Sequence, residues 1–168
     1  MKKLFIIAVL MISVGMANAQ KIKERVVDKF NGSVMIRTTD ESLFKTLGFT
    51  NLDVFARKIK SDTATYNSIS FLFGAVSALS LRSGDSAYFK FTDGSVTTLP
   101  YMFRYDFYGS KDIVYFTCEL SEDAAKLLIQ NQISDIRFTN SSYNRDFVIK
   151  EKYRQVVPNI CKLILAEN

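Results

Sequence analysis

The sequence predicts an α+β fold: a mostly antiparallel sheet of consecutive hairpins with two helices on one face. Several segments alternate apolar and polar side chains between short turns, and two later segments carry an apolar stripe at helical spacing. The 168 residues include only seven glycines and two prolines. Because the sequence contains no low-complexity linker, we expect one domain over residues 20–168.

The first strands are predicted from branched and aromatic residues. Residues 33–39 suit a strand because β-branched side chains favour extended backbone. Residues 52–60 fit one face of a helix and also one side of a strand, whereas residues 63–78 fit a strand. We interpret these last two segments as a hairpin and expect residues 40–51 to be irregular.

The central hairpin is the clearest local prediction. Two alternating segments flank Asp93-Gly94, a pair that favours a type I′ turn because both of its residues tolerate positive φ. The alternation places Phe89 and Phe91 on one side of the strand and Tyr88 and Lys90 on the other.

Further strands and two helices complete the predicted order. Ser121 is a suitable N-cap for the first helix, with acids at Glu122 and Asp123 near the positive end of its dipole. Pro158 must either kink the C-terminal helix or mark its start. The predicted elements are strands at residues 101–108, 113–118, 133–138 and 147–149, and helices at residues 121–131 and 153–164.

The N-terminus predicts an export signal. Lys2-Lys3 precedes an apolar run at residues 4–12, and Ala17-Asn18-Ala19 presents small side chains to a signal peptidase. The run is too short to span a bilayer. We expect residues 1–19 to be a signal peptide cleaved between Ala19 and Gln20, and the mature protein to be periplasmic or secreted.

Charge and composition exclude several functions. The net charge of +5 falls by two when Lys2 and Lys3 are removed, and the remaining basic residues alternate with acids, so we expect no nucleic-acid partner. Histidine is absent, which removes Ser–His and Cys–His nucleophile pairs and the commonest zinc ligand. The isolated glycines form no phosphate loop. We therefore expect no cofactor and no metal.

Two cysteines leave an alternative open. An exported protein can keep a disulfide between Cys118 and Cys161, but the simpler interpretation is two buried thiols that act as small apolar side chains.

Two sets of residues are candidates for function. Tyr101, Arg104, Tyr105 and Tyr108 could form a platform that stacks on a sugar ring or accepts a partner, although packing in the core explains the same aromatic pattern. Paired carboxylates could also support a small hydrolase. The acids considered are Asp93, Asp106, Glu119, Glu122 and Asp123, each of which also has a simple place in a turn, a helix start or an outward strand position.

Four segments resemble a group of small exported bacterial proteins of uncharacterised function. They are the F-x-D-G-S hairpin at residues 91–95, the L-S helix start at residues 120–121, the I-x-x-I-R strand at residues 133–137 and the V-x-K-E-K-Y segment at residues 148–153. The resemblance implies a mixed sheet-and-helix domain and carries no catalytic residue.

Together these observations favour an exported, non-enzymatic binding or interaction module, with an extracytoplasmic protein or a glycan as partner. A carboxylate hydrolase and a structural envelope protein are the alternatives. The mature form is not expected to span a membrane.

Overall fold

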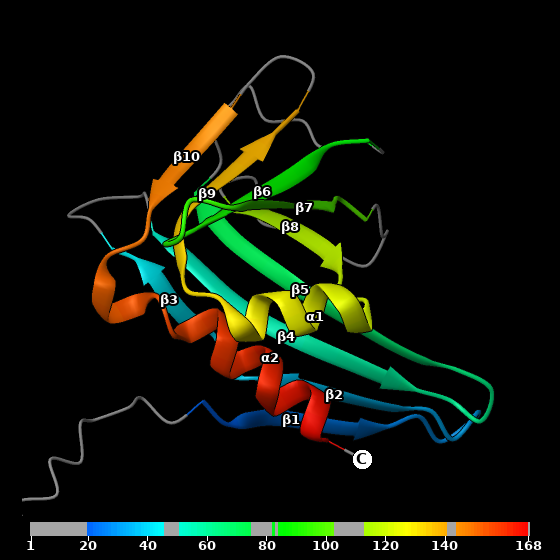
Figure 1. Cartoon of the computed structure of the whole chain (residues 1–168). Coiled ribbons are helices and arrows are strands. Elements are labelled where there is room, and N and C mark those ends of the chain that lie inside the picture. Colours follow the sequence, from blue (N-terminus) through cyan, green and yellow to red (C-terminus); the bar gives the residue numbers. More distant parts are fainter. Residues whose placement is uncertain are drawn as a thin grey trace, which may run out of the picture.

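The computed structural model describes residues 20–45, 51–74, 82, 84–102, 113–140 and 144–167. These residues form two antiparallel sheets and two α-helices (Figure 1). The predicted fold class, a mostly antiparallel α+β domain with two helices on one face, is confirmed. Within these ranges, no helix has the length and hydrophobicity needed to cross a bilayer.

The larger sheet has six strands. Its order is β1-β2-β4-β5-β8, and β3 pairs with β4 beside β2. The strands are β1 (Ile22–Val27), β2 (Val34–Thr38), β3 (Glu41–Phe44), β4 (Leu52–Lys60), β5 (Thr65–Gly74) and β8 (Ile113–Glu119). The segment that fitted both helix and strand is thus β4, and it forms the expected hairpin with β5.

The smaller sheet has four strands in the order β10-β9-β6-β7. They are β6 (Ser86–Phe91), β7 (Val96–Pro100), β9 (Ile133–Thr139) and β10 (Asn144–Val148). The β6–β7 hairpin turns at Asp93-Gly94 as predicted, but the predicted type I′ geometry is wrong, because Asp93 does not have a positive φ. Only Gly94 of the pair does, with a φ of 88°, which glycine adopts without strain, and its N–H donates to the Phe91 carbonyl at 3.0 Å.

The chain passes directly from one sheet to the other after β7. The Tyr101 N–H donates to the Asp85 carbonyl at 2.7 Å, and the next N–H, of Met102, donates to the Thr117 carbonyl at 2.8 Å. Tyr101 also forms an isolated bridge with Cys118 of β8. The two sheets are therefore tied together at this corner.

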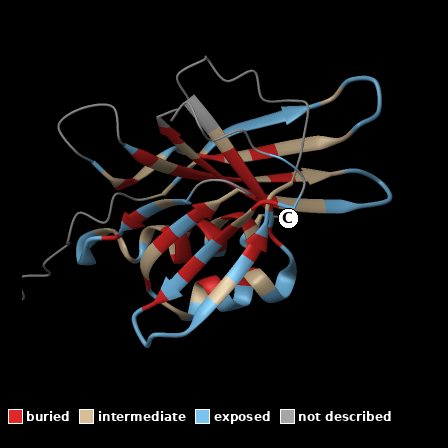
Figure 2. Ribbon diagram, turned by 90° about the horizontal axis from the view of Figure 1, so that it is seen from above, coloured by how far each residue is buried: buried red, intermediate tan, exposed pale blue. Residues whose placement is uncertain are grey.

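A shared aromatic core fills the space between the sheets. Phe138 of β9 is fully buried, and its ring centroid lies 5.3, 4.8 and 4.9 Å from those of Phe71, Phe73 and Phe116 in the larger sheet. Phe147 of β10 lies 5.9 Å from it. Figure 2 shows the buried residues in the interior and the exposed ones at the hairpin tips. Burial of these rings is the main force that joins the two sheets.

Helix α1 (Glu122–Gln130) begins where the sequence predicts. The Ser121 hydroxyl accepts a hydrogen bond from the Ala124 N–H at 3.2 Å, and Ala125 and Leu128 are buried. The helix ends at Gln130, one residue before the end of the predicted range, and Gln132 lies beyond it and is exposed.

Helix α2 (Val156–Ala166) follows a 3₁₀ turn, η1 (Glu151–Tyr153), and packs on β2 and β4. Pro158 is the third residue of α2, where its missing N–H would have no intrahelical acceptor, so it marks the helix start instead of kinking the helix. At the C-terminal end of α2, the ammonium of the buried Lys58 donates a hydrogen bond to the Glu167 carbonyl at 2.5 Å. Desolvation lowers the pKa of Lys58.

The outer face of the larger sheet is closed at its centre. Phe55, Ser70 and Thr117 lie side by side in register on this face, and all are buried. The Arg37 guanidinium covers the Phe55 ring at 4.0 Å. Among the described residues, the centre of this sheet face is therefore not open to solvent, whereas the outer face of the smaller sheet carries exposed side chains.

Two strands are absent from the sequence prediction. Half of the residues of β1 are charged and most are exposed, and β3 lies in a segment expected to be irregular. Both form because a neighbouring strand satisfies their backbone groups, which no local pattern reveals. The predicted signal peptide at residues 1–19 and residues 103–108 of the predicted aromatic strand lie outside the described residues.

Candidate functional site

The candidate site is the outer face of the smaller sheet. Because side chains alternate along a strand, the burial of Phe89 and Phe138 against the core turns their neighbours outward. On β6 these neighbours are Tyr88 and Lys90, and on β9 they are Asp135, Arg137 and Thr139. Asn144, Asp146 and Val148 of β10 and Val96 of β7 complete the face.

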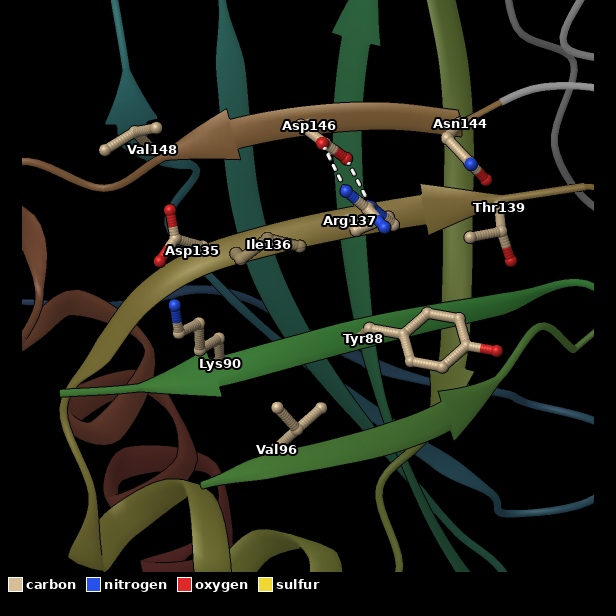
Figure 3. Close-up of a pocket in the computed structure, with 10 residues that line it drawn as sticks. All are labelled: Tyr88, Lys90, Val96, Asp135, Ile136, Arg137, Thr139, Asn144, Asp146 and Val148. Carbon is tan, nitrogen blue, oxygen red and sulfur yellow. Dashed lines mark hydrogen bonds and ion pairs between the residues drawn. The ribbon is translucent and has the colours of Figure 1, made fainter. Parts of the chain in front are cut away.

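The face is concave and open to solvent. It encloses a hollow of about 670 Å³, and Figure 3 shows the side chains that line it. Tyr88 is 40% exposed, and the apolar side chains Val96 and Val148 on the two edge strands are 59% and 64% exposed. In strand order, the exposed ring of Tyr88 on β6 thus lies between an exposed valine on each of the two edge strands.

A bidentate ion pair between β9 and β10 lines the hollow. Arg137 donates from Nε to Asp146 Oδ1 and from a terminal nitrogen to Oδ2, both at 2.7 Å. These hydrogen bonds lower the pKa of Asp146 and raise the pKa of Arg137. The pair is therefore ionised, and its two planar groups have a fixed orientation.

A second pair of opposite charges lies beside the first. Lys90 and Asp135 are direct cross-strand partners on this face, and Figure 3 shows the ammonium pointing toward the carboxylate. Asp135 also accepts a hydrogen bond from the Ser134 hydroxyl at 2.8 Å. The four charged side chains of the face, two basic and two acidic, therefore give it a net charge of zero.

A smaller hollow of about 460 Å³ adjoins the first and shares Lys90 and Asp135 with it. It lies over the β6–β7 turn and adds Asp93 and Arg154 to its lining. Asp93 accepts hydrogen bonds from the Ser95 N–H and hydroxyl, which lower its pKa. This second hollow extends the site past the end of the sheet.

The predicted aromatic platform is only partly described. Tyr101 is half-buried, and its ring centroid lies 5.0 Å from that of Phe116, so this residue packs against the core. Burial raises its pKa, and Asp85 raises it further. Arg104, Tyr105 and Tyr108 lie outside the described residues. A ligand platform built from these four residues therefore stays a prediction.

The described acids considered for hydrolysis are divided between the β7–α1 region and the β6–β7 turn. Glu119 and Asp123 line a hollow of about 500 Å³ between β7 and α1. The Asp123 side chain is 98% exposed and lies 4.0 Å from the Lys126 ammonium, and Glu122 pairs with the same lysine at 3.0 Å. Asp93 belongs to the turn at the other end of β7, and Asp106 lies outside the described residues.

Cys118 and Cys161 are both buried free thiols, so the possible disulfide between them is not formed. Burial raises the pKa of both, that of Cys161 to about 12, which keeps them protonated and unreactive. Within the described ranges, no group of three or more Cys, Asp or Glu residues is arranged to hold a metal ion.

The residues that form this site were not singled out by the sequence patterns. Alternation places Tyr88 and Lys90 on the outer side of their strand, but nothing local pairs β6 with β9, or Arg137 with Asp146. The available signal was the alternating pattern of β9 and β10, which places Arg137 and Asp146, of opposite charge, on the outward sides of the two strands.

Fold and site define an α+β domain of two sheets with one open, concave, polar and aromatic sheet face. The chain matches no protein-family model, no curated protein sequence and no solved structure. The resemblance to small exported proteins therefore remains a prediction.

Proposed function

We propose that this protein is an exported, non-enzymatic binding module that holds its ligand on the concave outer face of the smaller sheet. The observation that carries the proposal is the hollow of about 670 Å³, in which an exposed Tyr88 lies beside the Arg137–Asp146 pair. Ligand sites typically have this volume and combine apolar surface with a few convergent polar groups.

The strands that carry these side chains support a binding role. Tyr88 and Arg137 are direct cross-strand partners, and Asp146 is the partner of Arg137 on the next strand. β6 and β9 are each hydrogen-bonded on both sides. A ligand that binds here has little backbone to order, which lowers the free-energy cost of binding.

The state of the carboxylates favours binding over catalysis. Arg137 keeps Asp146 ionised, and Asp135 accepts a hydrogen bond from Ser134. The ionised Asp146 carboxylate is suited to accept hydrogen bonds from a ligand, whereas a general acid must hold a proton near neutral pH. The expected export signal directs the search for the ligand to molecules outside the cytoplasm.

The proposal is tested by mapping probes onto the protein by NMR. Isotopically labelled protein is titrated with neutral oligosaccharides, capped neutral peptides and sulfated oligosaccharides. We expect at least one class to shift the amide signals of Tyr88, Arg137 and Asp146 while those of Leu127 on α1 stay in place. If all three classes leave the face unchanged, or shift only other residues, the proposed function is wrong.

A further inference from the structure

Resting on the binding role proposed above, we infer that the ligand of the concave face is a neutral, extended oligosaccharide. Three independent features of the face lead to this class of ligand: its charge balance, its exposed aromatic ring and the shape of its two joined hollows.

Charge balance favours a ligand without net charge. Lys90 and Arg137 are matched by Asp135 and Asp146 on the main face. The second hollow adds one more acid and one more base, Asp93 and Arg154, and keeps the balance. An anionic or cationic polymer would meet like charges along its whole path, which disfavours its binding.

The same groups suit a ligand rich in hydroxyls. A hydroxyl both donates and accepts hydrogen bonds, so it can use a carboxylate and a guanidinium that lie side by side. Asp146 and Arg137 already orient each other, and each keeps further hydrogen-bonding capacity beyond the two bonds that join them. Two neighbouring hydroxyls of a sugar ring match this arrangement.

Tyr88 supplies the surface on which a sugar ring can stack. Its ring is 40% exposed and stands on the same face as Arg137, its cross-strand partner (Figure 3). The face of an aromatic ring is electron-rich and attracts the C–H groups on the apolar side of a pyranose. A stacked sugar would then present its hydroxyls to the adjacent Arg137–Asp146 pair.

The two hollows indicate a chain of sugars in place of a single one. They meet at Lys90 and Asp135 and run from the sheet face over the β6–β7 turn. An oligosaccharide can follow this path, whereas a monosaccharide would fill only part of it. Longer oligomers should therefore bind more tightly than their monomers.

The test is calorimetric titration of the purified protein with cellohexaose, N-acetylated chitohexaose and maltohexaose, and with the corresponding monosaccharides. We expect one hexasaccharide to bind at least about tenfold more tightly than its monomer. Because the ligand is neutral, its affinity should change by less than about twofold between low and high salt.

Variants separate stacking at Tyr88 from general effects. Y88A should weaken hexasaccharide binding by about tenfold, and Y88F, which keeps the ring, should bind within about threefold of the unaltered protein. F30A is the matched control, since Phe30 is fully exposed in the β1–β2 turn and lies outside both hollows. It should bind like the unaltered protein.

The outcomes distinguish this inference from the proposed function. If neutral hexasaccharides fail while a peptide or a sulfated oligosaccharide shifts Tyr88 and Arg137, the inference is wrong and the binding role stands. Equal affinity for monomer and hexamer, or unchanged binding by Y88A, also overturns the inference. If no probe of any class reaches the face, both proposals fail.

Discussion

Replacing Phe138 with alanine should remove much of the stability of the protein. Phe138 is fully buried, and its ring contacts three rings of the larger sheet and one of its own sheet. Truncation of a buried phenylalanine costs about 3–5 kcal/mol. Because four aromatic pairs are lost and both sheets border the cavity, we expect the upper end of this range, about 5 kcal/mol.

The effect is measurable by thermal and denaturant unfolding followed by circular dichroism. For a domain of this size, about 5 kcal/mol corresponds to a fall in Tm of about 10–20 °C. F30A makes the same chemical change at a fully exposed site and should alter the free energy of unfolding by less than about 0.5 kcal/mol. A loss below about 1.5 kcal/mol for F138A would refute the conclusion that this ring joins the two sheets.

Three other predictions test local features. S121A removes the N-cap of α1 and should lower the free energy of unfolding by about 1 kcal/mol in denaturant titrations, and no change would contradict the capping role. Iodoacetamide should leave native Cys118 and Cys161 unmodified but add to both after unfolding without reductant, as read by mass spectrometry; a disulfide would block both additions. Asp146 should titrate below the usual carboxyl range by NMR, and R137Q should raise its pKa toward that range. A depressed pKa stabilises the fold above the unfolded carboxyl pKa, and this contribution is lost as the pH falls through the folded value, so R137Q should reduce stability slightly at neutral pH and not below the folded pKa. An Asp146 pKa that R137Q leaves unchanged would contradict the pairing.

Element type was predictable wherever a local signal is strong. The β6–β7 hairpin follows from Asp93-Gly94 between alternating segments, and α1 follows from Ser121 and the acids after it. β1 and β3 lack such signals, because a charged edge strand and a four-residue strand owe their stability to the strands beside them.

The candidate site was likewise predictable only in part from local sequence. Tyr88 was placed on the outer side of its strand by alternation alone, but its importance depends on Arg137, 49 residues later, and on Asp146 of the next strand. Strand pairing over such separations depends on hydrogen bonds and burial shared between distant segments, which no sequence window contains.

The sequence by itself determined the class of fold, the order of most elements and which side chains of each strand face together, because these depend on local backbone preferences and a two-residue period. Only the tertiary structure decided that the strands form two sheets around Phe138, that the centre of the larger sheet's outer face is buried and that the smaller sheet presents an open, charge-balanced hollow. The reason is that burial and pairing are properties of the whole chain: each residue's environment is set by segments far away in sequence.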